Sequence, residues 1–237
     1  AFELAYQPKR QLQDNRAVGT EALVRWPHPQ RGTISPGEFI PLLEESDLVI
    51  PFGEWVLQTA CRQAASWARS RTDLASVAVN IAPRQLLDHH LPERVAAALR
   101  QSGLAAERLT LEVTERALVN ESPEVIRIFQ ELRDMGVRLA LDDFGTGYSS
   151  LRYIQQFPFT EIKIDRSFIT NLATESKEAA LIRTILTLAE TMDLEVVAEG
   201  VETEADRTRL LALGVTVAQG FGLGKPVAAY ALDSTPG

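Results

Sequence analysis

Two adjacent carboxylates, Asp142 and Asp143, end an apolar run in the stretch LALDDFGTGYSS (Leu139 to Ser150) and precede a loop with two glycines. Like charges this close raise the free energy of the folded chain unless a positive charge lies beside them. Divalent cations would supply that charge, and one bridging carboxylate would let the pair hold two ions. Paired ions of this kind activate water and bind a phosphoryl oxygen. The stretch therefore predicts a two-metal site for phosphoryl chemistry.

Other polar side chains lie near the ends of further strand-like runs. They are Glu21 and Arg25 in GTEALVRW, Asn80 in VAVNIA, Glu112 and Glu115 in LTLEVTE, Lys163 and Asp165 in EIKID, Glu199 in VVAEGVE and Gln219 in VAQGFGLGKP. An acidic residue near a strand end, taken alone, is more often a helix cap or a solvated loop residue. The convergence of several such residues at one end of a fold is better explained by metal binding, because unpaired charges are costly beside apolar sequence. The candidate ligands are oxygen donors, which favours Mg²⁺ or Mn²⁺ over zinc.

The elements that must position these residues alternate between strands and helices. Eight strand-like segments are expected, at residues 2–7, 19–25, 77–81, 108–113, 137–141, 161–164, 195–198 and 216–218. Helical patterns with apolar residues at three- and four-residue spacing lie between most of them. This rhythm over 237 residues predicts one α/β domain, a (β/α)8 TIM-like barrel, in which chemistry gathers at the carboxyl ends of the strands.

The first link departs from that rhythm. The segment LQDNRAV between the first two strands is shorter than the dozen or so residues that a parallel crossover needs. The first strand is therefore expected to run antiparallel to the second. Along the second strand, Glu21, Leu23 and Arg25 share one face, because side chains in a strand alternate between its two faces.

Composition limits the classes of function. The net charge of −8 disfavours binding to a DNA or RNA duplex, and no apolar run is long enough to span a membrane. The single Cys61 excludes an internal disulfide and favours a reducing compartment, so a cytoplasmic location is expected. The sequence begins almost directly on a strand, which is typical of a domain cut from a longer protein.

The quoted motifs together resemble the EAL domain family, bacterial phosphodiesterases that act on cyclic di-GMP. EAL itself stands at residues 21–23, and the other matching motifs follow in the family's order along nearly the whole chain. They are YQP, EALVRW, NIAPRQL, LEVTE, LDDFGTGYSSL, IKIDRSFI, VVAEGVE and QGFGLGKP. The sequence departs from the family at Ala82, where serine is common, and in GFGLGKP beside Gln219.

The resemblance implies a role for each matching residue. Those implied to bind metal are Glu21, Asn80, Glu112, Asp142 and Asp143. Those implied to act in catalysis at the metals and the attacking water are Lys163, Glu199, Asp142 and Glu21. Those implied to contact substrate are Arg25, Gln219, Leu23 and Asp165. Glu115 matches the residue that anchors the loop from Asp143 to Ser150, which in the family joins substrate binding and dimer contacts to metal occupancy.

The implied activity is metal-dependent hydrolysis of cyclic di-GMP to linear pGpG with two Mg²⁺ or Mn²⁺ ions. A homodimer, and sensory or GGDEF-type domains in the full-length protein, are also expected from the resemblance. The lack of a long apolar run predicts no membrane contact by this segment. A non-catalytic cyclic di-GMP receptor is the alternative, since some members of the family bind the nucleotide without cleaving it. Such receptors usually lack some of the acidic residues, and this sequence has all of them.

Overall fold

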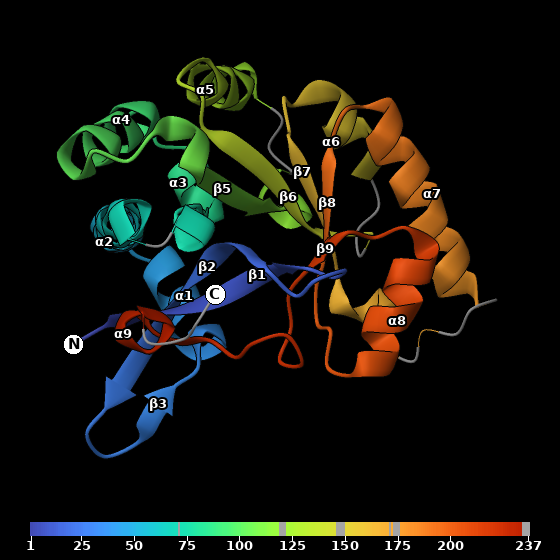
Figure 1. Ribbon diagram of the computed structural model, residues 1–237. Coiled ribbons are helices and arrows are strands. Elements are labelled where there is room, and N and C mark those ends of the chain that lie inside the picture. Colours follow the sequence, from blue (N-terminus) through green and yellow to red (C-terminus); the bar gives the residue numbers. More distant parts are fainter. Residues whose placement is uncertain (71, 119–121, 146–149, 171, 173–175, 234–237) are drawn as a thin grey trace.

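Eight strands close into a barrel in this computed structural model, which describes residues 1–237 except for 71, 119–121, 146–149, 171, 173–175 and 234–237 (Figure 1). The barrel strands are β1 (Glu3–Gln11), β2 (Ala17–His28), β4 (Val77–Asn80), β5 (Leu109–Thr114), β6 (Arg138–Phe144), β7 (Glu161–Ile164), β8 (Glu195–Ala198) and β9 (Val217–Ala218). They pair in the order β1-β9-β8-β7-β6-β5-β4-β2, and β1 pairs with β2 to close the ring. The predicted α/β barrel is confirmed.

The strand β1 runs antiparallel to both of its neighbours in the ring, β2 and β9, as the short first link predicted for β2. The other neighbouring pairs of the ring are parallel. Gln7 of β1 lies opposite Glu21, and Lys9 lies opposite Gly19, near the start of β2. The last residues of β1 therefore lie at the amino ends of the parallel strands.

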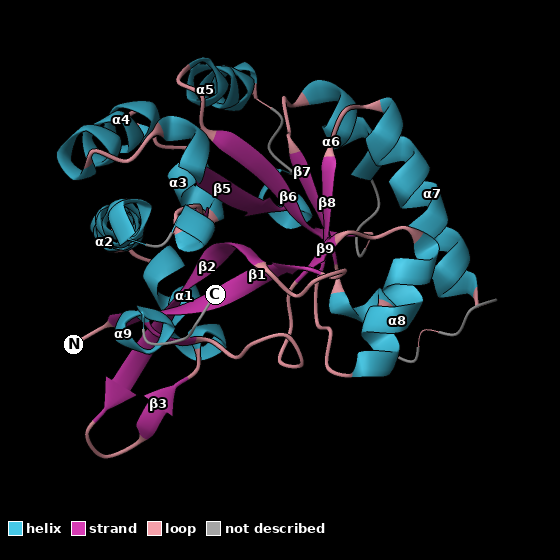
Figure 2. Cartoon of the chain, in the orientation of Figure 1, coloured by secondary structure: helices cyan, strands magenta, loops and turns pink. Residues whose placement is uncertain are grey.

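Helices surround the strands, with α2, α4 and α5 along one side and α7 and α8 along another (Figure 2). The longer helices are α2 (Val49–Ser70), α4 (Leu91–Ser102), α5 (Pro123–Asp134), α7 (Lys177–Thr191) and α8 (Glu204–Leu213). Shorter ones are α1 (Pro36–Glu44), α3 (Pro83–Leu86), α6 (Ser150–Gln156), α9 (Ala229–Asp233) and the 3-10 helices η1 (Thr72–Leu74), η2 (Ala106–Arg108), η3 (Glu115–Leu118) and η4 (Arg166–Phe168). Local sequence sets their ends: the Ser122 side chain caps α5 by accepting from the Val125 amide, and the left-handed Gly103 and Gly214 end α4 and α8.

Two strands of the structure were not expected from the sequence. The strand β3 (Gly32–Ile34) pairs antiparallel with the far end of β2, where Trp26 lies opposite Ile34. The expected second strand, which ended at Arg25, was therefore too short, and the β2–β3 hairpin extends beyond the ring in Figure 1. The strand β10 (Val227–Ala228) pairs with β1.

The apolar core lies between the barrel and its helices. Cys61 and Trp67 on α2 are completely buried, and the Trp67 ring meets the Tyr6 ring of β1 edge-on at 5.0 Å between centroids. Cys61 is a free thiol, as the sequence predicted, and burial raises its pKa to about 12. Across the described part of the chain, each helix is too short or too polar to cross a bilayer.

Candidate metal centre

Lys163 on β7 is the centre of a buried cluster of charged side chains at the carboxyl end of the barrel. Its Nζ lies 2.7 Å from Glu112 Oε2 and 2.7 Å from Glu199 Oε1. The same atom lies 3.3 Å from Glu21 Oε2 and 3.3 Å from Asp142 Oδ1. The Lys163 side chain is only 1% exposed. The strands thus bring together five of the residues that the sequence singled out.

Glu21 lies at the centre of a second set of contacts. Asn80 Nδ2 donates to Glu21 Oε1 at 2.8 Å, and Gln219 Nε2 donates to Glu21 Oε2 at 2.6 Å. Gln219 Nε2 also donates to Glu199 Oε1 at 2.8 Å. Burial would by itself raise the pKa of the Glu21 carboxyl, but Lys163 and the two amides hold it at about 2. Glu21 is therefore ionised at neutral pH.

The pKa values of two other carboxyl groups of the cluster are raised rather than lowered. Burial and the negative charge of Glu21 raise the pKa of Glu112 to about 8, although Lys163 and Lys9 act against the rise. Burial raises the pKa of Glu199 to about 7, again against Lys163. Lys163, together with Lys9 on the other side of Glu112, compensates only part of the negative charge gathered here. The cluster is therefore suited to taking up further positive charge.

Asp142, Asp143 and Glu199 are grouped as metal ligands would be, with one carboxylate oxygen of each lying within 4.8 Å of the others. Asp143 has a left-handed backbone, φ 54°, and its amide donates to Asp142 Oδ1 at 2.9 Å. The β6–β7 register shifts between Leu141 and Phe144, so the pairing of the two strands is irregular at this aspartate pair. Burial, Asp142 and Asp165 raise the pKa of Asp143. The backbone strain and the repulsion at this aspartate pair are typical of a functional site.

Leu23 and Arg25, which are predicted to contact substrate, lie two and four residues beyond Glu21 on β2. Leu23 and Arg25 are half-buried, and Arg25 Nη1 donates to the Val24 carbonyl at 2.8 Å. Burial lowers the pKa of the Arg25 guanidinium, while Glu21 favours its charged form. A guanidinium so placed has donors left for a phosphate, so its substrate role stays a prediction.

Asp165 and Glu115 have different local settings. Asp165 Oδ1 accepts from the Ser167 amide at 3.0 Å and so caps η4. This is the structural role, a helix cap, that an acidic residue at a strand end commonly has. Glu115 begins η3 and is buried, and within the described residues neither of its carboxylate oxygens has a hydrogen-bond partner. Residues 146–149 of its predicted partner loop lie outside the described residues, so the anchor role stays a prediction.

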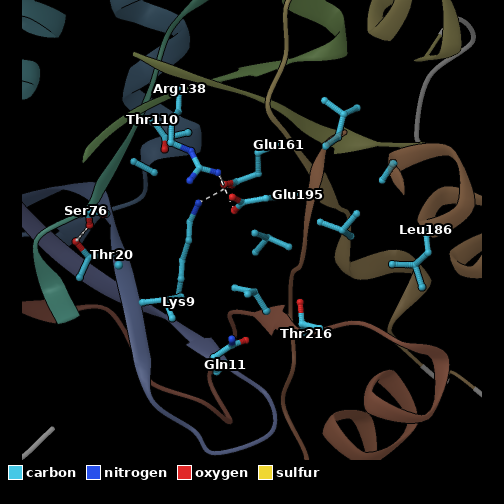
Figure 3. Close-up of a pocket in the computed structure, with 18 of the residues that line it drawn as sticks. Lys9, Gln11, Thr20, Ser76, Thr110, Arg138, Glu161, Leu186, Glu195 and Thr216 are labelled. Carbon is cyan, nitrogen blue, oxygen red and sulfur yellow. Dashed lines mark hydrogen bonds and ion pairs between the residues drawn. The ribbon is translucent and has the colours of Figure 1, made fainter. Parts of the chain in front are cut away.

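Sequence reasoning missed three charged residues inside the barrel, Lys9, Arg138 and Glu161. Lys9 Nζ lies 3.0 Å from Glu112 Oε1 and 2.8 Å from Glu161 Oε1. They face a cavity of about 660 Å³ at the amino end of the barrel, where Figure 3 shows the Lys9 side chain directed at Glu161. The available signals were a glutamate in the expected strand within TEIKI and a lysine in YQPKR, two residues past the end of the expected first strand.

A smaller cavity of about 160 Å³ lies beside Glu199 and Gln219. Its other lining residues are Gln7, Arg166, Gly200, Glu202, Gly220 and Phe221. Phe221 follows β9, and its side chain is largely exposed. The cluster around Lys163 therefore has open space next to it at the carboxyl rim.

Known proteins resemble this chain over almost its full length. The bifunctional diguanylate cyclase/cyclic di-GMP phosphodiesterase MucR of Pseudomonas aeruginosa is 44% identical over 229 residues, which is 97% of this chain and 33% of MucR. The oxygen sensor protein DosP of Escherichia coli K12 is 38% identical over 228 residues, 96% of this chain and 28% of DosP. The chain thus spans about a third of the length of these relatives.

Solved structures share the fold. PaMucR phosphodiesterase in a c-di-GMP complex has a TM-score of 0.90 and 44% identity, with 98% of this chain and 94% of that chain covered. The EAL enzyme Bd1971 with cAMP and cyclic di-GMP bound has a TM-score of 0.92 and 33% identity, with 98% and 63% covered. The sequence model of the EAL domain matches residues 1–226, and the chain belongs to the EAL domain family.

Proposed function

We propose that this chain is an active, metal-dependent phosphodiesterase that hydrolyses one phosphodiester bond of cyclic di-GMP and gives linear pGpG. The observation that carries the proposal is the buried cluster in which Lys163 contacts four carboxylates. The similarity to MucR, whose c-di-GMP complex shares the fold, supports the choice of substrate.

The donor atoms of the cluster fit a pair of hard divalent cations. Apart from the amide oxygen of Asn80, the proposed ligands are carboxylates: Glu21, Glu112, Asp142 and Asp143. Asn80 gives its amide nitrogen to Glu21, so its oxygen is the donor left for an ion. Oxygen ligands suit Mg²⁺ and Mn²⁺, and we propose two such ions. When bound, they would supply Lewis acidity at a phosphoryl oxygen and acidify the attacking water.

We assign the proton transfers to residues of the same cluster. Glu199 is a proposed general base, because its Oε1 lies 2.7 Å from Lys163 Nζ, the group that we assign to the attacking water. Asp142 is the other candidate for this role. Lys163, whose pKa the surrounding carboxylates hold well above its usual value against desolvation, stays charged and orients the water.

The proposed substrate contacts lie around this centre. Arg25 would bind a phosphate with its charge-assisted donors. Gln219 Oε1 is buried without a hydrogen-bond partner in the described part of the chain, so it can accept from the substrate or the water. Leu23 and Asp165 complete the set, and Glu115 would anchor the loop that follows Asp143.

A cyclic di-GMP receptor without catalysis is the second candidate, since the relatives include proteins solved with the nucleotide bound. The complete acidic set favours the enzyme. Incubation of the purified chain with cyclic di-GMP and Mn²⁺, with and without a chelator, followed by separation of the nucleotides, distinguishes the two. We expect pGpG only with the metal, and none from the Glu21→Gln variant; nucleotide binding without pGpG would support the receptor instead.

We also propose that residues 1–237 form one domain of a longer cytoplasmic or membrane-anchored protein that carries sensory or GGDEF-type domains. The MucR and DosP relatives, about three times as long, motivate this proposal. A homodimer is proposed from the family resemblance. Light scattering of the purified chain would test it, and a monomer mass at every concentration would contradict it.

A further inference from the structure

A column of alternating charges runs from the exposed Glu195 at the amino ends of the strands, through the barrel interior, to the metal centre. Its members, in order, are Glu195, Arg138, Glu161, Lys9, Glu112 and Lys163. Successive contacts are 2.7, 3.5, 2.8, 3.0 and 2.7 Å long. Figure 3 shows its amino-end half, where Lys9 and Arg138 approach Glu161 from two sides. We call this set the charge column.

Strand geometry explains why the charge column can reach the metal centre. Glu161 and Lys163 are two residues apart on β7, so both face the barrel interior. Lys9 enters from the opposite end because β1 runs antiparallel to its neighbours. Glu112 on β5 lies between the two lysines and is completely buried.

The two carboxylate oxygens of Glu112 have different partners. Oε2 contacts Lys163, within the cluster of proposed metal ligands. Oε1 contacts Lys9, on the side of the amino-end cavity. A carboxylate held at one oxygen cannot rotate freely, so the other oxygen keeps a fixed direction. Lys9 in turn is held by Glu161.

We infer that Lys9 is a positioning residue for the metal centre: its ammonium fixes Glu112 so that Oε2 faces the ions, and compensates part of the charge on that ligand. This inference rests on the proposed function, in which Glu112 is a metal ligand. Groups that orient metal ligands from outside typically change metal affinity or activity about 10- to 100-fold when they are removed. Lys9 lies outside the motif residues to which the family resemblance assigns roles.

A purely structural role for Lys9 makes a different prediction. A buried ion pair contributes little net stability compared with well-packed apolar residues, so a structural lysine could be replaced together with its partner without functional loss. The positioning role and the structural role therefore predict different metal affinities for a folded variant without Lys9. Metal affinity can be measured without nucleotide.

The test is calorimetric titration of the whole chain with Mn²⁺ alone, with kcat and KM for cyclic di-GMP as a second readout. We expect Lys9→Met to raise the Mn²⁺ dissociation constant about 10- to 100-fold and to lower kcat more than it changes KM. Lys9→Arg keeps a positive donor and should recover part of the affinity. Glu161→Gln keeps Lys9 and an amide oxygen that can accept from it, so it should change the dissociation constant less than about threefold.

Lys177→Met is the matched control, since it makes the same substitution at an exposed lysine at the start of α7. If Lys9→Met does not fold by circular dichroism, the Lys9→Met/Glu161→Gln variant, which removes both charges, takes its place. Wild-type Mn²⁺ affinity in a folded variant without Lys9 would overturn the inference and leave the proposed function standing. Failure of the wild-type chain to bind Mn²⁺ would instead reject the metal centre on which both depend.

Discussion

Lys163 is the residue on which the balance of charge at the carboxyl rim depends. Its ammonium is shared by four carboxylates, and two of them have pKa values raised to about 8 and about 7 despite its presence. An ammonium so completely buried is stable only because its partners surround it. Its Nζ lies within 3.3 Å of a carboxylate oxygen of each of the four.

Replacing Lys163 with methionine should therefore destabilise the metal-free protein. Removing one partner of a buried ion pair typically costs about 3–5 kcal/mol, since the remaining charges are left uncompensated. We expect a loss of this size in the free energy of unfolding, measured by urea denaturation with a chelator present. Added Mn²⁺ should restore part of the loss, because bound cations would replace the missing charge.

Lys177→Met serves as the control for this change as well, and should shift the free energy of unfolding by less than about 0.5 kcal/mol, as exposed substitutions usually do. Equal stabilities for Lys163→Met and the wild-type protein would show that the four carboxylates do not depend on this ammonium.

At the scale of elements, the ends of β8 and β9 are locked together through their backbones. The Val201 amide donates to the Gln219 carbonyl at 3.1 Å, and the Gly222 amide donates to the Val201 carbonyl at 2.9 Å. A side chain at Gly220 would bring a Cβ within 2.2 Å of the Val201 backbone. This close approach fixes Glu199 and Gln219 relative to each other.

Gly220→Ala should therefore push the two strand ends apart. We expect a loss of about 1–3 kcal/mol in the free energy of unfolding, the usual cost of overpacking, together with a loss of phosphodiesterase activity. Chemical denaturation and the pGpG assay measure the two effects.

Gly37→Ala is the matched control, because that glycine lies in α1 and an added Cβ would meet nothing closer than Ser35 Oγ at 3.7 Å. It should leave the stability unchanged or raise it slightly. A Gly220→Ala protein as stable and active as the control would refute the proposed locking.

The sequence predicted elements better than it predicted their contacts. Alternating strands and helices indicated the barrel, and the short first link indicated the reversed β1, because both follow from local spacing. The strand β3 was missed, since its three residues pair only with the overhanging end of β2. The left-handed backbone of Asp143 was also not predicted, because it depends on the register shift between β6 and β7.

The same limit applies to the candidate site. Motifs at strand ends predicted the cluster around Lys163, since parallel strands bring their carboxyl ends to one rim. Lys9 was missed because its position depends on how far β1 runs back along its neighbours. Such a stagger is set by pairing across the whole ring, and no local pattern contains it.

At the scale of the whole molecule, Cys61 reports on the integrity of the core between α2 and the barrel. Because burial raises its pKa to about 12, the thiol stays protonated at about pH 8, and we expect almost no reaction of the folded protein with a thiol reagent. The denatured chain should react with one equivalent, since it contains one cysteine.

The pH dependence of stability has a definite sign for this group. The unfolded thiol ionises near 9 and the folded one near 12, so the stability that its protonated form contributes is complete below 9 and falls as the pH rises toward 12. Cys61→Ala should remove this contribution to the loss of stability above pH 9. Rapid labelling of the folded wild-type protein would show instead that α2 opens readily.

The reversed strand β1 has a consequence for how the chain is made. It pairs with β2 at once, within a local hairpin, but its other partner in the ring is β9, some two hundred residues later. During synthesis from the amino terminus, the ring cannot be sealed until β9 has emerged. A truncated product that stops earlier would leave unsatisfied edges on β1 and β8, and exposed edges of this kind promote aggregation.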